Sequence, residues 1–146
     1  MIDAVIARWY AVIRGEAELD DLLHKDCVFW SPVLFQPQKG RDLTKLYLTA
    51  ASQVFPGDPH AYIDDPEGPA AIDAAGFRYT KKVLDGNHAV LEFETTMGGV
   101  VVNGVDIITC DDSGFIVEFK VMLRPMKAVA AVRDQMAVML ATLGNT

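Results

Sequence analysis

Asp106 is the residue of this sequence whose type conflicts most with its surroundings. Side chains of a strand point alternately to its two faces, so segment 100–110 divides into one set with Val100, Val102, Gly104, Asp106, Ile108 and Cys110 and another with Val101, Asn103, Val105, Ile107 and Thr109. If the first set faces inward, burial among aliphatic side chains favours the protonated carboxyl. That group could donate a hydrogen bond to a substrate oxygen or act as a base near neutral pH. Periodicity alone also allows Asp106 to face solvent or to accept from a backbone amide.

Three other polar residues could take part in chemistry. Tyr47 lies on the apolar side of a predicted helix, where its hydroxyl either finds a core partner or enters a pocket as a donor. Ser31 has no evident base and lacks the Gly-x-Ser-x-Gly elbow, so we do not expect a nucleophile there. His60, with Tyr62, belongs to an acidic segment and could close over a pocket mouth or stay solvated.

No pattern in the sequence predicts a metal ion or an organic cofactor. Cys27 and Cys110 lack metal-ligand spacing and are interpreted as small buried hydrophobic residues. The turn at 111–114 lacks the ligand spacing of a calcium loop, and Gly98–Gly99 joins two strands instead of cradling a phosphate.

The elements that must position these residues follow from hydrophobic periodicity and turn residues. We predict helices at 2–14, around 19–23, at 41–54 and after Pro125, and strands at 27–31, 77–84, 88–97, 100–110 and 115–123. Turn residues at 85–87, 98–99 and 111–114 join the last four strands into consecutive hairpins. The fold class is therefore α+β, with a curved antiparallel sheet closed on one side by helices.

Alternation predicts which face of the sheet the helices cover. In segment 88–97 the inward set is Ala89, Leu91, Phe93 and Thr95, opposite Glu92 and Glu94; in 115–123 it is Val117, Phe119, Val121 and Leu123, opposite Glu118 and Lys120. The other face of segment 100–110 is also largely apolar. It therefore predicts a homodimer formed through the outer face of the sheet.

Composition limits the classes of function. The 146 residues suit one domain, 1–146, and a hydrophobic content of 51% supports a packed core. A net charge of -7 disfavours nucleic acids and anionic membranes as partners. Without a membrane-length apolar run or a secretory signal, we expect a cytoplasmic protein. Segment 55–76, acidic and rich in proline, has no clear period and is typical of a lid or binding loop.

Two motifs resemble the nuclear transport factor 2-like superfamily, in its SnoaL-like and ketosteroid-isomerase-like branch. The first is Asp26-Cys27-Val28-Phe29-Trp30-Ser31-Pro32-Val33 followed by Gly40-Arg41-Asp42, and the second runs from Gly104 through Asp106 to Val117 and on to Arg124-Pro125-Met126. The resemblance covers nearly the whole chain. It implies a cone-shaped sheet around an apolar pocket, helices as the other wall, usually a dimer, and an inward Asp106.

The resemblance also implies roles for single residues. The position of the aspartate base of steroid isomerases is Ser31 here, and the tyrosine donor of the first helix corresponds to Trp9, or to Tyr10 if the alignment shifts by one. Asp106 matches the protonated co-donor. In SnoaL-type polyketide cyclases an aspartate of this strand region is the acid/base. Epoxide hydrolases of the limonene type need two aspartates bridged by an arginine, and no arginine lies on a predicted inward face.

The sequence thus predicts a pocket for a small apolar molecule, in an isomerase, cyclase or hydratase acting on a carbonyl compound. Asp106, Ser31 and Tyr47 are the candidate catalytic residues. The candidate ligand-binding residues are Trp9, Tyr10, Phe93, Ile108, Phe119, Val121 and His60. Two alternatives stay open: a binding module without catalysis, and a dimeric interaction domain that works through its outer sheet face.

Overall fold

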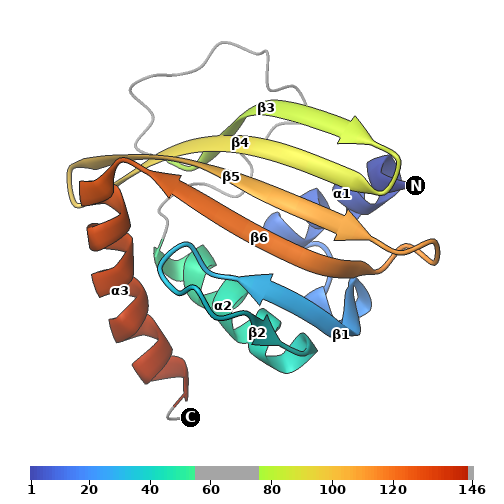
Figure 1. The fold of residues 1–146 in the computed structure, drawn as a ribbon, viewed down its shortest axis with the longest axis horizontal. Helices are drawn as coiled ribbons and strands as arrows, with labels where there is room; N and C mark the ends of the chain where they lie inside the picture. The colour runs from blue at the N-terminus through green and yellow to red at the C-terminus, as the bar shows by residue number, and fades with distance from the viewer. Residues whose placement is uncertain (55–75, 145–146) are drawn as a thin grey trace.

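The computed structural model of the chain describes residues 1–54 and 76–144 and has the predicted α+β class (Figure 1). The elements in chain order are α1 (Ile2–Ile13), the short 3₁₀ helix η1 (Leu19–Asp21), β1 (Leu23–Trp30), β2 (Gln38–Lys39), α2 (Arg41–Val54), β3 (Arg78–Asp85), β4 (His88–Met97), β5 (Val100–Cys110), β6 (Ile116–Arg124) and α3 (Met126–Gly144).

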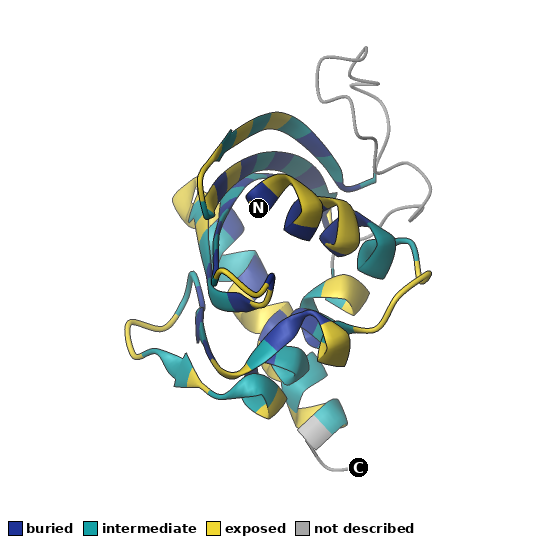
Figure 2. Ribbon diagram, turned by 90° about the vertical axis from the view of Figure 1, so that its right-hand side faces the viewer, coloured by how far each residue is buried: buried dark blue, intermediate teal, exposed yellow. Residues whose placement is uncertain are grey.

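The described strands form one curved, unclosed sheet in the order β2-β1-β6-β5-β4-β3. The three hairpins from β3 to β6 pair antiparallel as predicted, whereas β1 pairs parallel with β6. The main helices lie on the same side of the sheet (Figures 1 and 2). Helix α1 contacts β3, β4 and β5, and α2 packs against β1 and α3. The space between sheet and helices is therefore bounded by elements from both ends of the chain.

Burial follows the predicted alternation along the central strands, visible in Figure 2 as bands across the ribbon. The inward set of β4 is buried: Ala89, Leu91, Phe93 and Thr95. On β5 the set that contains Asp106 is the inward one, and Asp106 itself is only 6% exposed. The carboxyl therefore lies inside the protein.

The sheet departs from the predicted pattern at the start of β6. Val117 was expected to face inward, but it is half-buried and its neighbour Ile116 is fully buried instead. The register between β5 and β6 shifts between Thr109 and Cys110, so that Cys110 pairs with Ile116. This irregularity reverses the alternation for the first residues of the strand, and the prediction for Val117 is wrong.

Two helical predictions also need correction. Helix η1 ends at Asp21, because Leu23 already pairs with Ile116 as the first residue of β1. On α2 the period predicts an apolar face of Leu43, Leu46, Tyr47, Ala50 and Val54, but the buried residues are Thr44, Leu48 and Ala50. This helix is covered on two sides, by β1 and by α3, so its buried surface is wider than a single stripe.

Gly104 shapes the inner surface of the sheet. A Cβ atom at this position would lie 2.4 Å from Cζ of Phe93 and 2.7 Å from the backbone oxygen of Met122. Because glycine has no side chain, the Phe93 ring can lie across β5. The glycine in the inward set thus leaves room for an aromatic ring on the inner surface of the sheet.

No helix in the described ranges 1–54 and 76–144 is long and apolar enough to cross a lipid bilayer. Residues 55–75, with His60 and Tyr62, lie outside the described residues, so the lid prediction for this segment stays a prediction.

Candidate functional site

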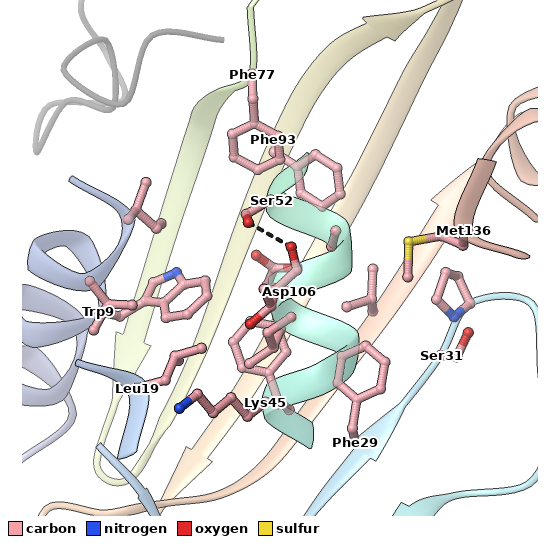
Figure 3. Close-up of a pocket in the computed structure, with 18 of the residues that line it drawn as sticks. Trp9, Leu19, Phe29, Ser31, Lys45, Ser52, Phe77, Phe93, Asp106 and Met136 are labelled. Carbon is pink, nitrogen blue, oxygen red and sulfur yellow. Dashed lines mark hydrogen bonds between the residues drawn. The ribbon is translucent and has the colours of Figure 1, made fainter. Parts of the chain in front are cut away.

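A cavity of about 440 Å³ lies between the concave face of the sheet and the helices (Figure 3). Aromatic and aliphatic side chains form most of its wall. The N-terminal region contributes Trp9, Val12, Ile13 and Leu19, and the sheet side contributes Phe77, Tyr79, Phe93, Asp106, Phe119 and Val121. Strand β1, helix α2 and the loop between them contribute Phe29, Ser31, Lys45, Leu48 and Ser52. Helix α3 contributes Val132 and Met136. Volume and lining are typical of a site for a small organic molecule.

Three buried side chains of this wall form a hydrogen-bonded series. The indole Nε1–H of Trp9 donates to Oη of Tyr79 at 3.0 Å, and the hydroxyl of Tyr79 donates to Oδ2 of Asp106 at 2.5 Å. Trp9 is 8% exposed and Tyr79 is 2% exposed. The polar groups of the series are thus paired with one another inside a largely apolar wall.

The sheet brings Tyr79 and Asp106 together across an intervening strand. Tyr79 on β3 pairs with Phe93 on β4, and Asp106 on β5 pairs with Leu91 on β4. Both side chains are inward, and the phenol is long enough to reach over β4 to the carboxyl. Trp9 reaches them from α1, which packs against these strands.

This environment changes the acidity of the carboxyl. Burial raises the pKa of Asp106 to about 7, although the hydrogen bond from Tyr79 acts in the opposite direction by favouring the carboxylate. The pKa of Tyr79 lies well above its ordinary value, mainly through burial and then through the negative charge of Asp106. Tyr79 therefore remains a donor near neutral pH, while Asp106 can gain or lose a proton there.

Two further polar residues of the described lining, Ser31 and Lys45, have partners of their own. Ser31 is buried and its Oγ accepts a hydrogen bond from the backbone N–H of Val33 at 3.2 Å. Lys45, from α2, forms an ion pair with Asp20 at 2.8 Å. Both side chains of that pair are about half exposed, so the pair lies at the solvent end of the cavity wall.

The structure brings most of the predicted site residues together. Those that line the cavity are Asp106, Ser31, Trp9, Phe93, Phe119 and Val121. Three others lie outside the lining. Tyr47 stacks on Phe29 with 5.2 Å between ring centroids, Tyr10 packs beside the Tyr79 ring at 5.8 Å, and Ile108 is fully buried in the core. Tyr10 is displaced because successive helix residues point in different directions, so that of these two neighbours Trp9 is the one that lines the cavity.

Sequence reasoning missed Tyr79, the direct partner of Asp106. A signal was available, because strict alternation in the predicted strand 77–84 puts Phe77 and Tyr79 on one face, and both are buried. The charged residues Arg78, Lys81 and Lys82 obscure that pattern, and the register shift between Tyr79 and Lys81 interrupts it.

A curved sheet with three helices on its inner side and a cavity between them is the architecture that the resemblance to the nuclear transport factor 2-like superfamily implies. No known family description matches the sequence, and no curated protein is found as a relative. Solved structures do match. A steroid delta-isomerase from Pseudomonas aeruginosa is 31% identical, with 99% of this chain and 94% of that chain covered and a TM-score of 0.78.

Two further structures agree with this similarity. A protein with a cystatin-like fold from Silicibacter pomeroyi is 31% identical, with 92% of this chain and 83% of that chain covered and a TM-score of 0.73. An NTF2-like protein from Mesorhizobium loti, 19% identical over 84% of this chain and 90% of that chain with a TM-score of 0.63, shares the fold. The chain belongs to the nuclear transport factor 2-like superfamily, in its SnoaL-like and ketosteroid-isomerase-like branch.

Proposed function

We propose that the protein is an enzyme of the isomerase or cyclase type, which binds a small apolar carbonyl compound and exchanges a proton with it through Asp106. The observation that carries this proposal is a carboxyl group buried in a cavity wall, with a pKa of about 7 and a fixed tyrosine donor on one oxygen. A pKa near the working pH suits general acid–base catalysis, because both protonation states are populated.

The proposed proton transfer needs no oxidant or co-reactant. The Asp106 carboxylate removes a proton from the carbon next to the carbonyl, and the electron pair of the broken C–H bond forms the enolate. The neutral carboxyl then returns the proton to a different carbon, so that the product is an isomer of the substrate. Ser31 is the hydroxyl that we propose as a donor to the substrate oxygen, because its Oγ already accepts from Val33 and its own proton remains to donate. Tyr47 is left out of the proposal, since it does not line the cavity.

The dimensions of the cavity limit the substrate. A volume of about 440 Å³ corresponds to roughly 15 water molecules at ~30 Å³ each. A mono- or bicyclic compound with a comparable number of non-hydrogen atoms fits this space. Apolar rings would contact Phe29, Phe93 and Phe119, and the carbonyl end would lie at Asp106.

One observation favours a second candidate, a binding protein without turnover. Ser31 occupies the position where the resemblance to steroid isomerases implies an aspartate base, and a serine hydroxyl does not accept a substrate proton near neutral pH. The lining residues in the described part of the chain include only one other carboxylate, Glu18, which is exposed. Among the described lining residues, Asp106 is therefore the candidate proton acceptor at the buried end.

Hydrogen–deuterium exchange separates the two candidates. Cyclic enones and cyclic ketones of suitable size are incubated with the protein in D₂O, and NMR follows deuterium uptake at the carbon next to the carbonyl. We expect uptake with the wild-type protein and at least a 100-fold slower uptake with Asp106→Asn. Asp112→Asn, which changes an exposed aspartate, is the matched control and keeps the wild-type rate. Ligands that bind without any deuterium uptake would contradict the enzyme and support the binding protein.

We also propose that the protein forms a homodimer through the outer face of the sheet. The support is a group of exposed apolar side chains on this face, Val83, Val90, Val101 and Met122. Val101→Asp is expected to lower the mass measured by light scattering to that of a monomer. Val138→Asp, at an equally exposed valine on α3, is the control and leaves the mass unchanged.

A further inference from the structure

The indole N–H group of Trp9 donates a hydrogen bond to another side chain of the protein, so it is not available as a donor to a ligand. Its acceptor is Oη of Tyr79, and this hydroxyl in turn donates to Asp106. No other hydrogen bond to the Asp106 carboxyl is found among the described residues, so Oδ1 is left without a protein donor there.

We propose that Trp9 is a positioning residue that acts on Asp106 through Tyr79: its N–H occupies an acceptor site of the phenol oxygen, directs the phenol proton to Oδ2, and so leaves Oδ1 as the carboxyl oxygen that meets the substrate. The proposal rests on the proposed function of Asp106 and adds the means by which one of its two oxygens is selected.

Packing fixes the series in the required orientation. The ring of Trp9 packs edge-on against Phe119 with 5.0 Å between centroids, and the ring of Tyr79 packs edge-on against Phe77 at 5.1 Å. All three hydrogen-bonding side chains are at least nine-tenths buried. Because water has little access, the indole N–H constrains the direction of the phenol oxygen.

Electrostatics makes the two hydrogen bonds interdependent. A phenol that accepts a hydrogen bond becomes a better donor, and such chains are cooperative in a low-dielectric interior. Tyr79 thereby stabilises the carboxylate form of Asp106 more strongly when Trp9 is present. Within the described part of the lining, the other charged groups act elsewhere, because Lys45 on α2 is paired with Asp20 and Glu18 is exposed. The described α3 residues of the lining, Val132 and Met136, are apolar.

The test is a double-mutant cycle with the pKa of Asp106, measured by carboxyl NMR, as its readout. Tyr79→Phe removes the donor to the carboxylate and is expected to raise this pKa by about 1–2 units. Trp9→Phe weakens that donor and is expected to raise the pKa by a smaller amount. In the Tyr79→Phe background the Trp9→Phe substitution is expected to add nothing, because its effect passes through the phenol.

Matched controls exist for both substitutions. Trp30→Phe removes an indole N–H that donates to Glu118 on the outer face, and Tyr47→Phe removes a hydroxyl outside the cavity. Neither is expected to change the pKa of Asp106. If Trp9→Phe does not fold, a tryptophan analogue with sulfur in place of the N–H keeps the ring and removes only the donor.

The outcomes distinguish this inference from the proposed function, since the titration needs no substrate. An equal shift from Trp9→Phe in both backgrounds would mean that Trp9 acts by burial alone, and would overturn the inference while leaving the enzyme proposal intact. No shift in either background would overturn it too. Non-additive shifts in a protein that never exchanges substrate protons would support the inference and refute the enzyme.

Discussion

The phenol oxygen of Tyr79 lies 2.5 Å from Oδ2 of Asp106, although the two residues belong to strands separated by β4. This contact places a neutral donor against a carboxyl that burial would otherwise keep protonated. The two effects oppose each other and leave the pKa of Asp106 at about 7. A pKa of about 7 populates both protonation states of Asp106 near neutral pH, as the proposed proton exchange requires.

The rate of substrate deuteration is expected to depend on pH through Asp106. The carboxylate is the proton acceptor, so kcat/KM should rise with pH and level off above the pKa of about 7. If the neutral carboxyl served only as a donor to the carbonyl, kcat/KM would instead fall above pH 7. A pH–rate profile measured with one ketone shows whether kcat/KM rises or falls through pH 7.

Folding stability is expected to decrease as pH rises through the same range. Between pH 3.8 and about 7 the folded protein keeps a proton on Asp106 that the unfolded chain has lost, so stability is greatest below the ordinary pKa and declines toward pH 7. At about 1.4 kcal/mol per pKa unit, the decrease attributable to Asp106 is about 4 kcal/mol in all, of which about 3 kcal/mol falls between pH 5 and 8. Urea unfolding of the wild-type protein and of Asp106→Asn, at pH 5 to 8, measures it. A constant difference between the two proteins over this range would contradict the buried acid.

Gly104→Ala is expected to destabilise the fold by about 1–3 kcal/mol, because the new methyl group would overlap the Phe93 ring and the Met122 carbonyl oxygen. In a Phe93→Leu background the same substitution should cost less, although the backbone clash remains. Urea unfolding of the single and double variants gives the coupling. Equal costs in both backgrounds would show that the Phe93 ring is not held against Gly104.

Filling the cavity is expected to abolish ligand binding without unfolding the protein. Val121 lines the cavity, whereas its neighbour Met122 is 50% exposed on the other face of β6. Val121→Trp should remove binding of an apolar fluorescent dye, and Met122→Trp should leave it unchanged. Circular dichroism checks that both variants are folded. Dye binding that survives Val121→Trp but is lost in Met122→Trp would place the binding surface outside the cavity.

The sequence predicted the architecture and the candidate Asp106, but not its partner Tyr79. Hairpin turns and alternation predicted β4 and β5 with their observed bounds, and the resemblance decided that Asp106 faces inward. These features are local, since each depends on residues within one strand or turn. Val117 was misassigned because the irregular register of β6 depends on pairing with β5, which no pattern within a strand reveals.

Tyr79 was missed for a related reason. Its position next to Asp106 depends on the register of three strands and on the curvature of the sheet, and its own strand carries three lysine or arginine residues that weaken the apolar pattern. Trp9 was assigned to the cavity through the resemblance, yet its hydrogen bond to Tyr79 could be seen only in three dimensions.

Trp9 and Tyr79 are 70 positions apart in the chain, and Tyr79 and Asp106 are 27 apart. The Tyr79–Asp106 contact therefore joins strands β3 and β5 of the sheet, whereas the indole donor depends on the docking of helix α1. Undocking of α1 would remove the indole donor from the phenol oxygen while the Tyr79–Asp106 pair stayed within the sheet.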